Sequence, residues 1–334
     1  MQDNSDLTDH ELRAVFLKRP GFAEIDRLDP GDLVPFLEVC ACGICCTDRK
    51  AFAVPPRAMS LPRIPGHEVA GRMLLDMPGS GLKRGDRVVL WPALACGRCR
   101  LCKSGRQNLC SSILLFGCHL HGGLAEALFL PRELVPGARL IKIPENLSWH
   151  MASLCEPLAC VLNGFRRLSD GFQRCLVVGA GLMGRLAARV AGLSGMEVLL
   201  HDIHPGRLEQ ALADGNRFNG LPADIVFVAA SGEGAVEFGI RNLAPGGTAV
   251  LFSGQGRDCS LGVTHNDIHR REFSLQGAYG CREKDMRTAM SMLSRGDVKA
   301  GDLITGLISL EEVPGELCRT TGVDEYRTVM VNGE

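Results

Sequence analysis

The chain lacks a long apolar run, a strong net charge and internal repeats, and each absence narrows its class. No uninterrupted apolar stretch is long enough to span a bilayer, and the polar N-terminus MQDNSDLTDHELRAVFLKRP has no signal-peptide core. A formal net charge of -1 supplies no global field that would attract nucleic acid or an anionic membrane. The sequence therefore predicts a cytoplasmic protein that binds neither nucleic acid nor membrane.

The cysteine count argues against a disulfide framework. The 334 residues suit two domains, and they include 15 cysteines, an odd number, without a secretory signal. In a reducing compartment, clustered cysteines more often hold metal, whereas scattered ones behave as small apolar residues. We place four cysteines in the second class and expect them to be buried: Cys160, Cys175, Cys259 and Cys318.

The pattern of strand, turn and helix signals in the sequence changes near residue 146. Before it, glycine and proline turns separate short β-like runs, such as residues 87–90 and 134–135, which predicts an irregular β-rich domain. After it, apolar strand candidates alternate with helical patterns, which predicts a parallel α/β sheet. The strand candidates cover residues 176–178, 198–200, 225–228 and 248–252, and the helical patterns cover 182–193, 235–243 and 285–295.

Four cysteines are crowded into residues 96–110, CGRCRLCKSGRQNLC. Their spacing, C-x2-C-x2-C-x7-C, predicts a zinc site formed by Cys96, Cys99, Cys102 and Cys110. Four sulfur ligands leave the metal no open position, so this zinc would be structural. The alternatives are an iron–sulfur cluster, whose run usually continues with a nearby cysteine and proline, and a coincidental group of free thiols.

Residues 179–184, GAGLMG, follow a strand candidate and open a helix, which is the context of a dinucleotide-binding turn. The predicted cofactor-binding turn comprises Gly179, Gly181, Leu182, Met183 and Gly184. Gly179 permits the tight turn, Gly181 lets the pyrophosphate approach the backbone, and Gly184 lets helix and strand pack closely. Asp202 ends the next strand candidate, where a carboxylate would accept from ribose hydroxyls and repel a 2′-phosphate, so NAD is favoured over NADP. Arg207 opposes that preference, because it could meet a phosphate. The alternative is a structural glycine turn with a solvated aspartate.

Three further segments contain metal-binding residue types: ACGICCTD at 41–48, IPGHEVAG at 64–71 and LCEPLA at 154–159. By spacing alone they are only suggestive, since a lone histidine such as His67 more often has a structural use. In this order, together with the four-cysteine segment and the glycine turn, they resemble the zinc-dependent medium-chain dehydrogenases, in the branch of sorbitol and threonine dehydrogenases. Residues 271–277 and 303–305 also resemble late segments of that family.

The resemblance implies an α/β protein with two domains. A GroES-like β-rich catalytic domain would cover residues 1–150, with a structural zinc lobe at about 91–112, and residues 285–334 would complete it. A Rossmann domain with a doubly wound parallel sheet would cover residues 151–284 and would bind NAD. Relatives are commonly dimers or tetramers, so a homodimer or homotetramer is expected.

The resemblance also implies a second, catalytic zinc, giving two zinc ions per chain. Cys45, His67 and Glu156 would reach it, and Glu68 would be an alternative or exchanging ligand. The open position would take a water or a substrate oxygen, so the zinc could act as a Lewis acid while hydride passes from the carbinol carbon to NAD. Thr47 would accept the hydrogen of the substrate hydroxyl. Cys42 and Cys46 flank this site and are expected to pack, with Cys46 a minor alternative ligand.

The chain departs from the family pattern at two places. Lys50 stands where the family usually has the histidine that relays the proton, so either a solvated charge or a contact to an anionic substrate group is expected from Lys50 or Arg49. The helix and strand after Asp202 are expected to be shortened through residues 214–220. Trp91, Phe116 and His119 are candidates for the substrate pocket, with packing as the alternative.

The sequence thus predicts an NAD-dependent zinc oxidoreductase that acts on a small-molecule secondary alcohol or its ketone. A polyol, cyclitol or amino alcohol, possibly with an anionic group, is the substrate class expected by analogy. A catalytically inactive zinc- and nucleotide-binding scaffold or sensor is the alternative. A zinc-ribbon that binds nucleic acid has little support, because basic residues are not concentrated enough.

Overall fold

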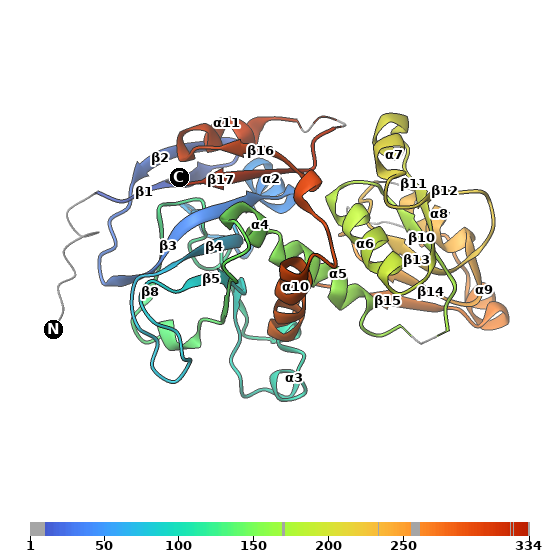
Figure 1. Cartoon of the computed structure of the whole chain (residues 1–334), viewed down its shortest axis with the longest axis horizontal. Helices are drawn as coiled ribbons and strands as arrows, with labels where there is room; N and C mark the ends of the chain where they lie inside the picture. The colour runs from blue at the N-terminus through green and yellow to red at the C-terminus, as the bar shows by residue number, and fades with distance from the viewer. Residues whose placement is uncertain are drawn as a thin grey trace.

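The computed structural model describes residues 11–168, 171–232, 234–254, 261–320, 322 and 324–332. Two large sheets lie at opposite ends of the molecule, and helices α5 and α10 run between them (Figure 1). One sheet belongs to a β-rich region and the other to an α/β region, as predicted. None of the helices in the described residues is both long and apolar enough to cross a membrane.

The β-rich region is built around a seven-stranded sheet in the order β16-β17-β3-β4-β5-β9, with β8 paired to β3. Residues near both ends of the chain meet here, because β17 pairs antiparallel with β3. The strands are β1 (Arg13–Arg19), β2 (Phe22–Arg27), β3 (Leu33–Ile44), β4 (Glu68–Met73), β5 (Arg87–Leu90), β6 (Ala93–Leu94), β7 (Leu114–Leu115), β8 (Ala127–Pro131), β9 (Leu140–Lys142), β16 (Ile304–Ile308) and β17 (Arg327–Val331). The helices are α2 (Cys46–Ala53), α3 (Arg100–Lys103), η1 (Gln107–Leu109), η2 (Val135–Gly137), α4 (Trp149–Ser153), η3 (Gly301–Leu303), η4 (Leu310–Glu312) and α11 (Val313–Cys318).

The α/β region is a six-stranded, wholly parallel sheet in the order β12-β11-β10-β13-β14-β15. This is the strand order of a Rossmann fold, with the switch point between β10 and β13. The strands are β10 (Arg174–Val178), β11 (Glu197–His201), β12 (Asn216–Arg217), β13 (Ala223–Val228), β14 (Leu243–Leu251) and β15 (Ser274–Gly277). The helices are α5 (Cys155–Phe165), α6 (Leu182–Leu193), α7 (Pro205–Ala211), α8 (Ala235–Arg241), α9 (His265–Arg271) and α10 (Glu283–Arg295).

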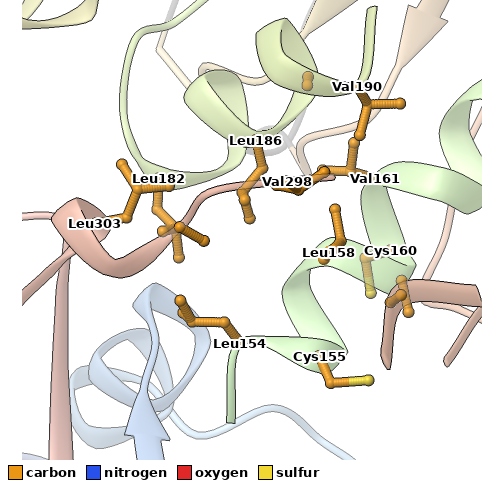
Figure 2. Close-up of a cluster of buried hydrophobic side chains, with 14 of the residues drawn as sticks. Leu154, Cys155, Leu158, Cys160, Val161, Leu182, Leu186, Val190, Val298 and Leu303 are labelled. Carbon is orange, nitrogen blue, oxygen red and sulfur yellow. The ribbon is translucent and has the colours of Figure 1, made fainter. Parts of the chain in front are cut away.

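Alternating residues of the strands supply two hydrophobic cores. Cys175 and Val177 of β10 face a cluster that includes α5 and α6, whereas Leu176 and Val178 face a cluster that includes α8. Figure 2 shows the first cluster, in which Leu158 and Val161 of α5 approach Leu186 of α6. Because both faces of the sheet are covered, its strands read as continuous apolar runs.

Several local expectations need correction. Residues 134–135 are not a strand: η2 covers Val135–Gly137, because Pro136 fixes its own φ and has no N–H for a sheet ladder. Cys318 is exposed at the end of α11, whereas Cys160 and Cys175 are buried as expected, and Cys259 lies outside the described residues. The helix and strand after Asp202 are shortened, as predicted, but both are present as α7 and β12. Residues 218–222 then lead to β13 without a crossover helix.

Candidate active site

The register of β3 against β4 brings Cys45 and His67 together. Gly43 of β3 pairs with Glu68 at the start of β4, so the residues just beyond this pair meet at the same end of the sheet. Cys45 Sγ lies 3.2 Å from His67 Nε2. Cys45 also caps α2, since its sulfur accepts from the Thr47 N–H at 3.1 Å. The backbone itself therefore fixes the thiol at this position.

A buried carboxylate orients His67. Asp48 Oδ1 lies 3.4 Å from His67 Nδ1, and the same carboxylate accepts from the backbone N–H groups of Cys45 at 2.9 Å and Gly66 at 3.0 Å. Burial opposes a charge on His67, but the Cys45 thiol and the Asp48 carboxylate raise the pKa of His67 well above its usual value. In the metal-free chain the group therefore keeps protons that a cation would have to displace.

Two glutamates complete the cluster. His67, Glu68 and Glu156 each place a ligand atom within 4.8 Å of the others, and His67 also belongs to a group with Cys45 and Asp48. Glu156 stands in the first turn of α5, which packs against β4. The buried Glu68 has one oxygen paired with Arg327 at 2.9 Å, while its Oε2 has no hydrogen-bond partner among the described residues. Burial raises the pKa of Glu68 to about 7, although Arg327 opposes that shift.

These donors fit a catalytic zinc ion. A thiol, an imidazole and carboxylate oxygens are the ligands that open zinc sites use, and the unpaired Glu68 oxygen needs a partner that the described residues do not supply. Cys46 is exposed at the start of α2 and belongs to no such cluster among the described residues, and Cys42 is buried in the sheet. Thr47 and Lys50 are exposed on α2, the helix that Cys45 caps.

The four-cysteine lobe forms a second cluster, around α3 and η1. The Cys96–Cys102 and Cys99–Cys110 sulfur atoms are both 3.9 Å apart. Sulfur atoms at the corners of a tetrahedron about zinc, with Zn–S of about 2.3 Å, would be about 3.8 Å apart. The backbone N–H groups of Arg98 and Cys99 lower the pKa of Cys96 to about 6, which favours the thiolate. The lobe thus fits a closed, structural zinc site.

The glycine turn has the geometry that a dinucleotide needs. Gly179 has φ +101°, and a Cβ there would lie 2.7 Å from the Ala230 nitrogen. A Cβ on Gly184 would lie 1.7 Å from the Gly179 oxygen, so only glycine lets helix α6 start this close to β10. A Cβ on Gly181 would meet nothing within 4 Å, so the space above the N-terminus of α6, at Leu182 and Met183, is open to an anion.

Asp202 contacts this turn through its carboxylate. Its carboxylate accepts from the Ala180 N–H and the His204 N–H, both at 2.8 Å, and its remaining lone pairs can accept from a ribose. Arg207 is half-buried in the first turn of α7. Phe218, which follows β12, packs edge-on against Phe238, and Phe238 stacks on His201.

The chain is similar to known alcohol and polyol dehydrogenases in sequence. Residues 31–145 match the alcohol dehydrogenase GroES-like domain. L-Galactonate-5-dehydrogenase of Escherichia coli K12 is 30% identical over 83% of this chain and 84% of its own length. D-Altritol 5-dehydrogenase of Agrobacterium fabrum C58 is 30% identical over 90% of this chain and 94% of its own. The chain belongs to the zinc-dependent medium-chain dehydrogenase/reductase superfamily. A crystal structure described as a zinc-binding dehydrogenase from Sinorhizobium meliloti 1021, bound to NADP, superimposes with a TM-score of 0.86 at 25% identity, covering 97% of this chain and 100% of that one.

Sequence reasoning missed two residues of this dehydrogenase site. Asp48 lies inside a recognised segment but carried no assigned role, although an aspartate three residues after the N-cap of a helix is a signal for a capping contact. Arg327 gave no sequence signal, since it reaches the site from the last strand. The structure brings the other predicted zinc donors together in two groups that share His67, and it buries the pocket candidates Phe116 and Trp91. The third candidate, His119, is half-buried and accepts from the Leu115 N–H through Nδ1. Phe116 is buried against Phe36, and the Trp91 indole donates to the Cys281 carbonyl.

One cavity in the described residues lies away from the donor cluster. A cavity of about 1190 Å³ lies between α10 and the segments near Met77 and Arg139, and no zinc-donor residue lines it. The arginines that line it are largely paired: Arg287 with Glu283, and Arg295 with Asp297. This cavity contains no zinc donor, so the candidate site is identified by the chemistry of its donors.

Proposed function

We propose that this oxidoreductase transfers hydride between NAD(H) and a secondary alcohol or its ketone, with a polyol or sugar acid as the substrate class. The observation that carries the proposal is the convergence on His67 of two donor groups, one with Cys45 and one with Glu68 and Glu156. The relatives support the substrate class, because their names describe dehydrogenases of L-galactonate and D-altritol. Cyclitols and amino alcohols remain within the proposal.

Each residue has a proposed task. Cys45, His67 and Glu156 would hold the catalytic zinc, Glu68 would be an exchanging ligand, and Asp48 keeps His67 oriented through Nδ1. Zinc bound there would polarise the substrate oxygen and supply the Lewis acid of the reaction. Thr47, exposed beside Cys45 on α2, accepts the hydrogen of the substrate hydroxyl. The four cysteines of the lobe hold a second, structural zinc.

The cofactor proposal is NAD in preference to NADP. Asp202 puts a carboxylate at the end of β11, beside the open N-terminus of α6, where a 2′-phosphate would be repelled. Arg207 on α7 is the residue that could reverse the preference, and the S. meliloti structure shows that NADP also occurs with this fold. A homodimer or homotetramer in the cytoplasm remains our prediction for assembly and location.

One spectrophotometric screen tests the proposal. Polyols, sugar acids, amino alcohols and their phosphates are offered with NAD and, separately, with NADP, while absorbance of the reduced nicotinamide is followed. Expected is oxidation of at least one polyol or sugar acid, faster with NAD, in protein that contains two zinc ions by elemental analysis. Zinc and nucleotide binding without hydride transfer across the panel would instead favour the inactive scaffold.

A further inference from the structure

A third group of possible metal ligands lies next to the catalytic donors. Glu156, Cys160 and Cys281 place one ligand atom each within 4.8 Å of one another. The Cys160 thiol donates to Glu156 Oε1 at 3.1 Å. This group shares only Glu156 with the donors assigned above to the catalytic zinc. Glu156 therefore stands between two clusters, one with an imidazole and one with two thiols.

The three side chains come from rigid elements. Glu156 and Cys160 are four residues apart on α5, so they share one face of the helix. Figure 2 shows the Cys160 sulfur pointing away from Leu186 and Val190 of α6. Cys281 lies between β15 and α10, and its carbonyl accepts from the Trp91 indole at 3.0 Å. Because α5 and α10 pack against each other, the group is held in place without a bound ion.

The local charge favours a cation. The Glu156 carboxylate places a negative charge beside both thiols. Both cysteines are buried, at 8% and 4% exposure, so solvent screens this charge weakly. Two sulfurs and one carboxylate oxygen are three of the four ligands of a tetrahedral site for a soft divalent ion. Binding would release the two thiol protons to solvent, and no redox change is needed.

We propose that Glu156, Cys160 and Cys281 form a second cation position, which takes a thiophilic divalent ion such as cadmium or excess zinc. A filled position engages the Glu156 carboxylate and so removes it from the catalytic donors. Excess thiophilic metal therefore slows turnover. This last consequence rests on the proposed function, whereas binding of the ion does not.

The test adds cadmium to protein that already holds its two zinc ions. Bound cadmium and retained zinc are counted by elemental analysis after dialysis, and the ultraviolet sulfur-to-cadmium charge-transfer band is recorded. Cys160→Ala and Cys281→Ala remove one sulfur each, and either suffices if the other fails to fold. Cys175→Ala is the matched control, because Cys175 is a buried thiol that belongs to no ligand group in the described residues.

Expected is one additional cadmium per chain in the parent and in Cys175→Ala, with zinc retained. Cys160→Ala and Cys281→Ala should bind that cadmium at least ten-fold more weakly and lose the added absorption. Equal uptake by all four proteins, or uptake matched by loss of zinc, would overturn the proposed position. The binding measurement needs no substrate, so it remains decisive if the proposed dehydrogenase activity fails.

The rate measurement tests the link to Glu156. With a substrate from the screen, cadmium should slow the parent and Cys175→Ala at least ten-fold more strongly than Cys281→Ala. Cadmium that binds the parent without any loss of rate would overturn the withdrawal of Glu156 from the catalytic donors.

Discussion

Arg327 Nη2 lies 2.9 Å from Glu68 Oε1, and both side chains are almost completely buried. Arg327 also donates to the Ile44 carbonyl at 2.6 Å, next to Cys45. Arg327, on the last strand β17, thus balances the charge of the Glu68 carboxylate in the candidate active site. The other oxygen of Glu68, Oε2, has no hydrogen-bond partner among the described residues, so this glutamate is paired at one oxygen only.

Loss of Arg327 should therefore destabilise the fold strongly. Arg327→Met leaves a buried carboxylate without its partner, which costs about 3–5 kcal/mol in the free energy of unfolding. Denaturant unfolding of the zinc-loaded protein measures this cost. The double variant Arg327→Met/Glu68→Gln should recover part of it.

The matched control is Arg72→Met, which breaks the exposed pair of Arg72 with Glu38. That loss should stay below about 1 kcal/mol, as for other exposed pairs. A cost for Arg327→Met no larger than that of the control would contradict our account of the pair.

Asp48→Asn should weaken zinc binding at the catalytic donors. The variant removes the negative charge that faces His67 Nδ1 and leaves one oxygen for two backbone N–H groups. Loss of such an outer partner typically lowers metal affinity by about 10–100-fold. Competition with a chromophoric chelator measures the affinity, and Asp26→Asn, an exposed carboxylate on β2, is the control. Unchanged affinity would show that Asp48 only caps the helix.

Much of the fold and of the site could be predicted, because residues close together in the sequence specify these parts. The strand, glycine turn and helix at residues 174–193 are specified by neighbouring residues, and so is the four-cysteine lobe. The role of Arg327 could not be predicted from local patterns, since the Ile44 carbonyl that it contacts lies 283 positions away in the sequence. The role of Arg49 was also missed. Its charge is paired with Glu316 at 2.6 Å, so it is not available to a substrate anion.

Cys110→Ser should remove one zinc ion per chain. The Cys110 sulfur lies 3.9 Å from that of Cys99 and closes the lobe from the far side of η1. Metal analysis should find one zinc in place of two, and the thermal unfolding midpoint should fall. Two retained zinc ions would rule out the four-cysteine site. Cys318→Ser, at an exposed thiol, is the control.

Lys50→Ala should discriminate between charged and neutral substrates. With Arg49 occupied by Glu316, Lys50 is the exposed cation of α2 that can meet an anionic group. Its loss should raise the Michaelis constant for sugar acids or phosphates by about two- to five-fold, the range of an exposed ion pair. The constant for neutral polyols should not change. Lys142→Ala, which removes the cation paired with Asp86, is the control. Equal effects on both substrate types would mean that Lys50 is only a solvated charge.

Glu316 should make stability depend on pH in the acid range. Burial alone would raise its pKa, but contacts to Arg319, Thr328 and Arg49 lower the pKa of Glu316 to about 2. A carboxylate with a depressed pKa stabilises the fold above its unfolded-state value of 4.5, and that contribution disappears as the pH falls from 4.5 to about 2. The full contribution at neutral pH is about 3 kcal/mol. Glu316→Gln should thus lose most at pH 7 and nothing near pH 2, as measured by urea unfolding across this range. Glu133→Gln, at an exposed site, should show no such trend. A loss for Glu316→Gln that stays constant from pH 7 to pH 2 would mean that packing, and not charge, fixes the role of this residue.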